Sequence, residues 1–310
     1  MNRTLAATIA ATMAASMTLI GCDKTETPKA APAVAAATKA AAARPNDGLP
    51  EPNCPGKVDA ALTGPDIVGL KLGMTRDAAL NFARCLNQEA LVNFEGNWLQ
   101  GLRTFGIKLA PQAFTTRVGE SSPCKYKSFD DMQKCGVGNR VWNHVAELIT
   151  VASPGAPGRE KVVGIWREQH FKPGEMPAAE TLMPALVQKY GPPQMTQAQA
   201  GAWMRLDWVQ DPSGTPLPAN SRGLNACRGI NARGQDAHSW SESCGLTLTA
   251  MIMLSRENPG LVRELNIGMV HQQALYTLGT SLQVELQAMD RQRRRREIEQ
   301  SKGSNANVKL

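Results

Sequence analysis

The second half of the sequence alternates apolar and polar residues in short runs, which is the pattern of half-buried β-strands. Residues 203–209, 245–254 and 265–269 each carry apolar side chains at every second position. The turn-forming residues Asn258-Pro259-Gly260 separate the last two runs. We therefore predict three antiparallel strands in chain order, with a long polar connection over 210–244.

Two further runs, 145–151 and 161–169, are rich in β-branched and aromatic residues, which favour strands. Pro-Gly pairs at 154–155 and 157–158 lie between these runs and favour tight turns. The two runs are therefore expected to pair as a hairpin. A shorter extended segment is expected over 66–72.

Three segments have the apolar spacing of amphipathic helices. The first follows Thr75, whose hydroxyl can cap it, and extends to Leu86. The second covers 178–190, and its regular part is expected to begin near Met183 because Pro184 interrupts the pattern. The third covers 273–300, and its leucine spacing predicts a helix docked on the sheet.

Helices interspersed with hairpins predict an α+β fold in which helices pack on an antiparallel sheet. With 42% hydrophobic and 20% charged residues, the chain of 310 residues can bury a core, which excludes general disorder. We expect one folded domain over 54–300 and a disordered tail over 301–310. A match in spacing between residues 70–80 and 265–275 leaves two explanations open, an internal repeat and chance.

The first 22 residues have the layout of an export signal. Arg3 supplies a positive charge, and an apolar stretch follows that is too short and too rich in hydroxyls to span a membrane. The stretch ends in Leu19-Ile20-Gly21-Cys22. These four residues resemble the lipobox of bacterial lipoproteins.

The resemblance implies that residues 1–21 are removed as a signal peptide and that Cys22 is lipidated, with palmitate among its acyl chains. Two or more acyl chains anchor a protein stably, whereas one chain holds only marginally. The lipobox therefore implies a domain attached to the cell envelope and facing the periplasm. Asp23 resembles an inner-membrane retention signal, which slightly favours that membrane, and the outer membrane remains the alternative.

Residues 22–53 are expected to form a flexible linker after the lipidated cysteine. The segment is dominated by alanine and proline and contains no large apolar residue before Leu49, so it cannot bury a core. A flexible chain of this length has a root-mean-square reach of roughly 30 Å. The alternative is a helix packed on the domain, because alanine favours helices.

Six cysteines remain after Cys22, an even number, in a chain predicted to be exported to a disulfide-forming compartment. Six cysteines allow fifteen pairings. We expect nearest neighbours to pair, because two of those pairs enclose polar segments without an apolar face. The expected bridges are Cys54–Cys85, Cys124–Cys135 and Cys227–Cys244. Free buried thiols are the alternative.

The carboxyl terminus concentrates positive charge. From Asp290 onward the chain has five arginines and two lysines against three acidic residues, whereas the whole chain has a net charge of only +7. Anionic lipid or an acidic envelope protein is the expected partner, and nucleic acid is not expected in this compartment. The alternative is a basic helix end that only complements its own dipole. The candidate contact residues are Arg291, Arg293, Arg294, Arg295 and Arg296.

Catalytic, cofactor and metal signatures are missing from the sequence. No two histidines or cysteines have the spacing of a zinc site, and no cofactor is predicted. Each of the four histidines, His144, His170, His238 and His271, is interpreted as a packed or surface residue. We therefore expect no catalytic residue and no metal ligand.

Two local resemblances remain. Gly73-Met74-Thr75 and the segment from Val163 to Pro192 resemble uncharacterised envelope lipoproteins of Gram-negative bacteria. The Gly-Met-Thr lead into a helix is also similar to the small lipoproteins of the barrel-assembly machinery, over about 15 residues. Together these features predict a non-enzymatic protein of envelope binding, assembly or maintenance. The alternative is a hydrolase or modifying enzyme that acts on peptidoglycan or peptides.

Overall fold

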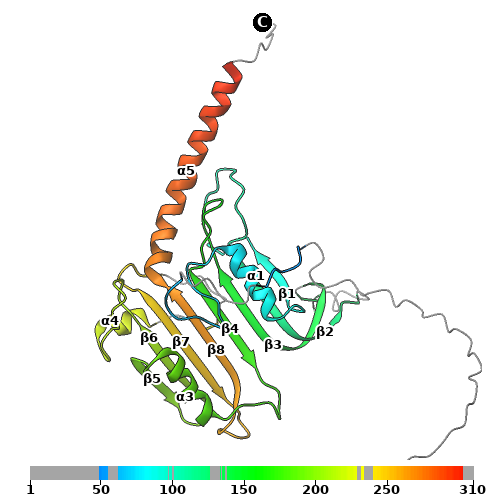
Figure 1. The fold of residues 1–310 in the computed structure, drawn as a ribbon, viewed down its shortest axis with the longest axis vertical. Helices are drawn as coiled ribbons and strands as arrows, with labels where there is room; N and C mark the ends of the chain where they lie inside the picture. Colours follow the sequence, from blue (N-terminus) through cyan, green and yellow to red (C-terminus); the bar gives the residue numbers. More distant parts are fainter. Residues whose placement is uncertain are drawn as a thin grey trace, which may run out of the picture. The chain divides into compact units, whose positions relative to one another are not determined.

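The structure is a computed structural model that describes residues 49–54, 62–96, 98–99, 101–125, 133, 135–136, 138–228, 232–233 and 240–302. The described residues belong to one compact unit. Among the described residues, four helices accompany one antiparallel sheet of eight strands (Figure 1). The predicted α+β class and the antiparallel sheet are therefore confirmed.

The strands are β1 (Leu91–Glu95), β2 (Ala113–Pro123), β3 (Arg140–Ala152), β4 (Gly164–His170), β5 (Met195–Gln199), β6 (Trp203–Val209), β7 (Leu246–Leu254) and β8 (Val262–His271). The helices are α1 (Arg76–Leu86), α3 (Ala179–Tyr190), α4 (Arg222–Cys227) and α5 (Gln272–Lys302). The strand order across the sheet is β1-β2-β3-β4-β8-β7-β6-β5.

The strand order divides the molecule into two halves that repeat one plan. In the first half α1 is followed by the meander β1 to β4, and in the second half α3 is followed by β5 to β8, with α4 inserted before β7. The last strands of the halves, β4 and β8, pair antiparallel at the centre of the sheet. Their register is symmetric, because Gly164 pairs with Val270 and His170 pairs with Glu264.

Backbone hydrogen bonds repeat between the halves at matching places. Val162 N donates to Met74 O just before β4, and Val262 N donates to Pro177 O at the start of β8. A similar match occurs at the far ends of the hairpins, where Ser153 N donates to Gln112 O and Leu254 N donates to Ala202 O. The structure therefore contains an internal repeat, but it relates 76–170 to 179–271. Residues 70–80 and 265–275 do not correspond in this repeat, since the first segment leads into α1 and the second spans the end of β8 and the start of α5. Of the two explanations left open for their similar spacing, the structure favours chance.

One face of the sheet packs on α1 and α3, which both lie over it (Figure 1). Thr75 caps α1, since its hydroxyl accepts a hydrogen bond from Ala78 N. The inward side chains of α1 and α3 pack on every second residue of the strands, such as Ile165 and Ile267. This face is the main core.

The opposite face of the sheet meets α4 at Val209 and the start of α5 at Trp166 and Val270. The rest of this face, which we call the helix-free face, is lined by the strand residues that alternate with those of the main core. It carries buried polar side chains that include Thr150, Glu168, Glu264 and Asn266. The alternating runs predict half-buried strands, in which polar side chains such as these face solvent. Their burial is the main departure from the sequence pattern.

Several local predictions were wrong. Pro184 does not delay α3, which begins at Ala179, because the one lost hydrogen bond would go to the carbonyl of Glu180, an exposed residue that water can reach. Residues 66–72 form only the isolated bridge between Ile67 and Leu70. Strands β1, β2 and β5 were not predicted, although the other strands and three of the helices were.

α5 is docked along its first five turns only. Leu282 and Leu286 are fully buried against a loop that includes Leu99, Leu102 and Ile107. From residue 291 to residue 302 every residue is exposed. The end of α5 therefore extends beyond the part of the domain on which it packs.

Candidate functional site

The predicted lipidation site, Cys22, and most of the predicted linker lie outside the described residues. The same is true of residues 303–310 of the predicted tail, whereas Ser301 and Lys302 are the last residues of α5. Among the described residues, no helix combines the length and apolar character needed to cross a membrane. Attachment through Cys22 therefore stays a prediction.

The three expected disulfides are present. Cys54 bonds to Cys85, Cys124 to Cys135, and Cys227 to Cys244. Cys124–Cys135 lies in the first half of the repeat and Cys227–Cys244 in the second, whereas Cys54–Cys85 joins the segment before the first half to α1. Nearest-neighbour pairing is thus confirmed.

The five candidate arginines fall into two groups on α5. Arg293 and Arg294 both form ion pairs with the buried Asp290, at 2.5 Å and 3.0 Å. Arg293 also donates to the backbone carbonyl of Phe105, which ties α5 to the loop beneath it. Arg291, Arg295 and Arg296 have no ion-pair partner within the part of the chain that the structure describes. Only this second group is available for an external anion.

A cluster of charged side chains lies at the centre of the helix-free face, on β4 and β8. Asn266 is directly opposite Glu168, and Glu264 is directly opposite His170. Asn266 donates to Glu264 at 2.6 Å, and Arg233 from the connection between α4 and β7 also donates to Glu264. The Glu168 carboxylate lies 4.0 Å from the Arg233 guanidinium. We call these five residues the central charge cluster.

The two carboxyl groups of the cluster have different environments. Burial raises the pKa of Glu168, and the neighbouring Glu264 carboxylate adds to the rise although Arg233 opposes it. Burial also acts to raise the pKa of Glu264, but hydrogen bonds from Asn266 and Arg233 outweigh it and lower that pKa. Burial lowers the pKa of His170 despite the nearby Glu264. Of the two carboxyl groups, Glu168 is therefore the one whose charge the fold disfavours.

Two hydrogen-bond acceptors in the cluster lack a donor. Glu168 Oε1 and Asn266 Oδ1 are both buried and have no hydrogen-bond partner. Their residues are directly opposite in the register, on the same face. A proton on Glu168 would supply the missing donor, since a neutral carboxyl group can donate one hydrogen bond.

We expect Glu168→Gln to raise the melting temperature at neutral pH, because glutamine brings an N–H donor and carries no charge. The gain should be smallest near pH 4, where folded and unfolded Glu168 are both protonated. It should grow as the pH rises above about 4.5, because the unfolded carboxyl group ionises before the folded one. Thermal melts of both proteins at stepwise pH values measure this difference. A loss of stability at neutral pH would contradict the assignment.

A patch of large side chains lies beside the cluster, towards the edge strand β5. Trp203 pairs with Met253 and Arg205 pairs with Met251, all on the helix-free face. The four side chains are partly exposed. The Arg205 guanidinium forms an ion pair at 2.9 Å with the carboxylate of Asp207, which is fully buried. We call Trp203, Arg205, Met251 and Met253 the tryptophan–methionine patch.

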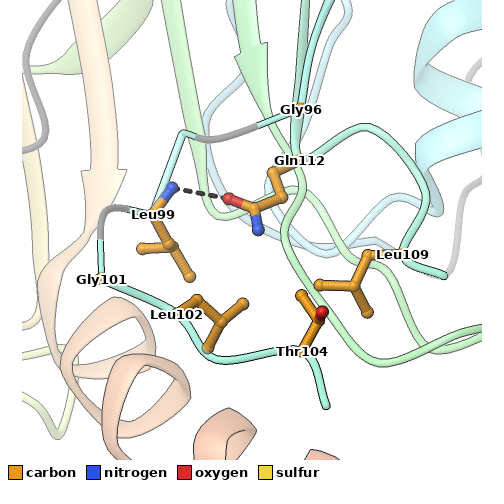
Figure 2. A pocket seen from close by; sticks show the side chains of 7 residues that line it. All are labelled: Gly96, Leu99, Gly101, Leu102, Thr104, Leu109 and Gln112. Carbon is orange, nitrogen blue, oxygen red and sulfur yellow. Dashed lines mark hydrogen bonds between the residues drawn. The ribbon is translucent and has the colours of Figure 1, made fainter. Parts of the chain in front are cut away.

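A cavity of about 580 Å³ is lined by the connection between β1 and β2 (Figure 2). Figure 2 shows the side chains of Leu99, Leu102 and Leu109 around it, with Thr104 beside them. The Gln112 amide oxygen accepts a hydrogen bond from Leu99 N at 2.6 Å, so this side chain stabilises the loop between β1 and β2. The same loop packs on α5, and we interpret the cavity as a gap in this docking.

A second cavity, of about 570 Å³, lies where β8 passes into α5. Its wall is mainly apolar and includes Val163, Leu246 and Met269, with His271 among its polar residues. Burial lowers the pKa of His271, and its Nδ1 accepts a hydrogen bond from Ala274 N. His271 is therefore a helix cap, in agreement with its interpretation as a packed residue.

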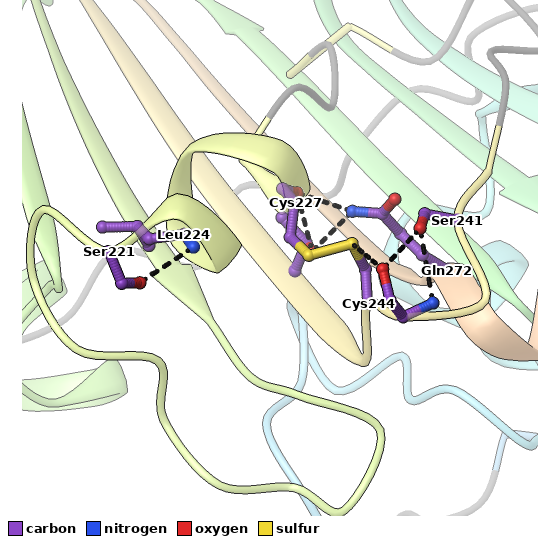
Figure 3. Close-up of a disulfide and its surroundings, with 8 residues drawn as sticks. Ser221, Leu224, Cys227, Ser241, Cys244 and Gln272 are labelled. Carbon is purple, nitrogen blue, oxygen red and sulfur yellow. Dashed lines mark hydrogen bonds between the residues drawn. A yellow bond between two sulfur atoms is a disulfide. The ribbon is translucent and has the colours of Figure 1, made fainter.

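The Cys227–Cys244 bridge joins α4, β7 and the start of α5 (Figure 3). The carbonyl of Cys227 accepts a hydrogen bond from the Gln272 amide at 2.6 Å, and Gln273 N donates to the carbonyl of Cys244 at 2.8 Å. Both cysteines are buried. The bridge thus closes the long connection and also fixes the base of α5.

Sequence reasoning missed the central charge cluster and the tryptophan–methionine patch. The sequence did contain a signal for the cluster. Because successive side chains of a strand alternate between the two faces of the sheet, Glu264 and Asn266 share one face of β8, and Leu265 and Ile267 share the other. What the sequence lacked was the pairing of β4 with β8, which brings Glu168 to the same place. Among the described residues, no group of three or more acidic, histidine or cysteine side chains could hold a metal ion.

Comparisons with known proteins give no relative: no protein-family model, no curated protein and no solved structure matches the chain.

Proposed function

We propose that this protein is a lipid-anchored lipoprotein of the periplasm with a non-enzymatic role, and that it binds a protein of the cell envelope through its helix-free face. The lipobox at Cys22 supports the anchoring, and the three disulfides fit an oxidising compartment. The observation that carries the binding role is the tryptophan–methionine patch. Trp, Met and Arg are the residue types enriched at protein interfaces.

The patch has the structural support that a binding surface needs. Its members lie on β6 and β7, inside the sheet, and the partner strands on both sides fix their backbone. Arg205 is held by the buried Asp207, which also accepts a hydrogen bond from Thr249 at 2.6 Å. Pre-ordered side chains lose little conformational entropy when a partner binds.

Anchoring is tested by Cys22→Ser in the full chain. We expect the variant to be unlipidated and either uncleaved or secreted, since the acyl chains on Cys22 supply the attachment of the mature protein. Fractionation of cells and amino-terminal mapping of the mature protein measure the result. A mature protein that begins elsewhere than Cys22, or a variant of mature length that stays on salt-washed membranes like the wild type, would disprove the lipid anchor.

The binding surface is tested by photo-crosslinking in cells. A photoreactive amino acid at Met253 should give a discrete adduct with one envelope protein. The matched control places the same amino acid at Glu180, an exposed residue of α3 on the other side of the sheet. Adducts from both positions alike, or from neither, would overturn the assignment of this face.

One observation favours the alternative, an envelope hydrolase. A buried carboxyl group with a raised pKa is a feature of catalytic acids, and Glu168 has both properties. Arg233, however, lies over the cluster. Half of the Arg233 side chain is exposed, whereas the Glu168 side chain is buried, so Arg233 and not Glu168 faces the solvent. Cell-wall turnover by the purified protein that disappears in Glu168→Gln would favour the enzyme.

A further inference from the structure

The exposed end of α5 carries a line of residues on one side. The spacing of 7, 4, 3 and 4 residues places them within a narrow sector of the helix surface. We call this line the arginine stripe, and it consists of Val284, Arg291, Arg295, Ile298 and Lys302.

The stripe points away from the rest of the domain. The buried residues Leu275, Leu282 and Leu286 lie on the opposite side of the helix, where α5 packs on its loop and on the sheet. Nothing in the described structure covers the stripe, because residues 291 to 302 are all exposed. The docked half of α5 therefore fixes the direction in which the stripe faces.

Two exposed apolar residues belong to the stripe. The side chains of Val284 and Ile298 are among the few large hydrophobic side chains that the structure leaves exposed, at 62% and 56%. Ile298 lies between Arg295 and Lys302 on the helix surface. Exposed apolar side chains between basic ones are not required in a helix end that is only solvated. Helices that lie at a lipid interface, in contrast, combine basic residues with apolar ones.

The ion pairs of α5 leave this stripe positive. Asp290 engages Arg293 and Arg294, which lie off the stripe, and Glu297 also contacts Arg293. Arg291 and Arg295 have no ion-pair partner among the described residues, and Lys302 pairs with the exposed Glu299. The free guanidinium groups can each donate two hydrogen bonds to one phosphate.

We propose that the arginine stripe docks on the headgroups of an anionic phospholipid membrane, with Ile298 and Val284 entering the boundary between headgroups and acyl chains. The proposal rests on the membrane attachment in the proposed function, because lipidation at Cys22 confines the domain near such a surface. A single weak contact then acts at high local concentration. The stripe sets how the domain is oriented on the membrane.

Vesicle binding tests the stripe without the lipid anchor. The protein is the chain from residue 22 onward with Cys22→Ser, which retains every described residue. We expect it to sediment with vesicles that contain phosphatidylglycerol and not with phosphatidylcholine alone, and to dissociate in about 1 M salt. Arg291→Gln with Arg295→Gln should weaken the partition coefficient about 30-fold, since each basic residue contributes about fivefold.

The matched control is Arg293→Gln with Arg294→Gln, which removes the same charge from the same helix turns but not from the stripe. It should weaken binding less than about fivefold, and a melting curve monitors its fold. Ile298→Ser leaves the charge unchanged and should weaken binding about fivefold. Equal losses in the two arginine pairs, or full binding by Ile298→Ser, would overturn the proposal.

The two proposals can fail separately. If Cys22→Ser of mature length stays on salt-washed membranes while the stripe variants still bind vesicles like the wild type, the anchor is wrong and the stripe is wrong too. If Cys22→Ser leaves the membrane and the purified protein binds no vesicles, the anchor stands and the stripe is disproved. Vesicle binding that depends on the stripe, with a failed anchor, would support the lipid contact alone.

Discussion

Replacing both Cys227 and Cys244 with alanine is expected to lower the free energy of unfolding by about 4 kcal/mol, of which about 3 kcal/mol comes from the closed loop. The two cysteines are separated by 17 residues. The remainder arises because both sulfur atoms are buried with Val209 and Leu224, so their removal leaves a void. Urea denaturation of the oxidised proteins measures the change.

The control for this prediction is the corresponding pair at Cys124 and Cys135, which are separated by 11 residues and are only partly buried. Loop closure depends on the logarithm of loop length, so this pair should cost nearly the same entropy, about 3 kcal/mol, without the packing loss. If the Cys124 and Cys135 variant were the less stable of the two, the role given to burial at Cys227 and Cys244 would be wrong.

Leu282→Ala in α5 is expected to destabilise the protein by about 3 kcal/mol, because a fully buried leucine is replaced by a cavity. Leu282 packs where α5 meets Ala156 and the loop of Leu99 and Leu102. The change should loosen the docked half of the helix, and chemical denaturation measures it.

Val284→Ala, two residues along on the outward side, is the matched control, since Val284 is 62% exposed. It should change stability by no more than about 0.5 kcal/mol. A similar loss in both variants would mean that α5 packs through a different face from the one the structure shows.

The part of the fold that could be predicted from the sequence is the part with strong local signals. Thr75 caps α1 as expected, and the alternation of Met204, Leu206 and Trp208 correctly indicated which face of β6 enters the core. Strand β2 was missed because its inner half is buried while residues 119–123 are mostly exposed, so a single period does not run through it. Edge strands β1 and β5 are only five residues long, and short polar runs such as Met195–Gln199 resemble loops.

The candidate sites depended on long-range pairing, which the sequence does not display. Glu168 and Asn266 are close only because β4 pairs with β8. The basic cluster near the carboxyl terminus was visible from composition, but the division into held and free arginines required the position of Asp290 on the helix. Local pattern thus identified the basic segment, and geometry selected Arg291 and Arg295 within it.

The repeat of the two halves has a consequence for how the chain folds. Every strand pair except β4–β8 joins two strands that follow each other in the sequence within one half. Each meander can therefore form without the other half. The β4–β8 pair must bring Gly164 to Val270 and therefore carries the largest loop-closure cost. None of the three disulfides joins the two halves, because two close inside one half and Cys54–Cys85 ties the segment before α1 to the first half. An oxidising compartment can therefore complete every covalent crosslink before the two halves meet, and their meeting is expected to limit the rate of folding.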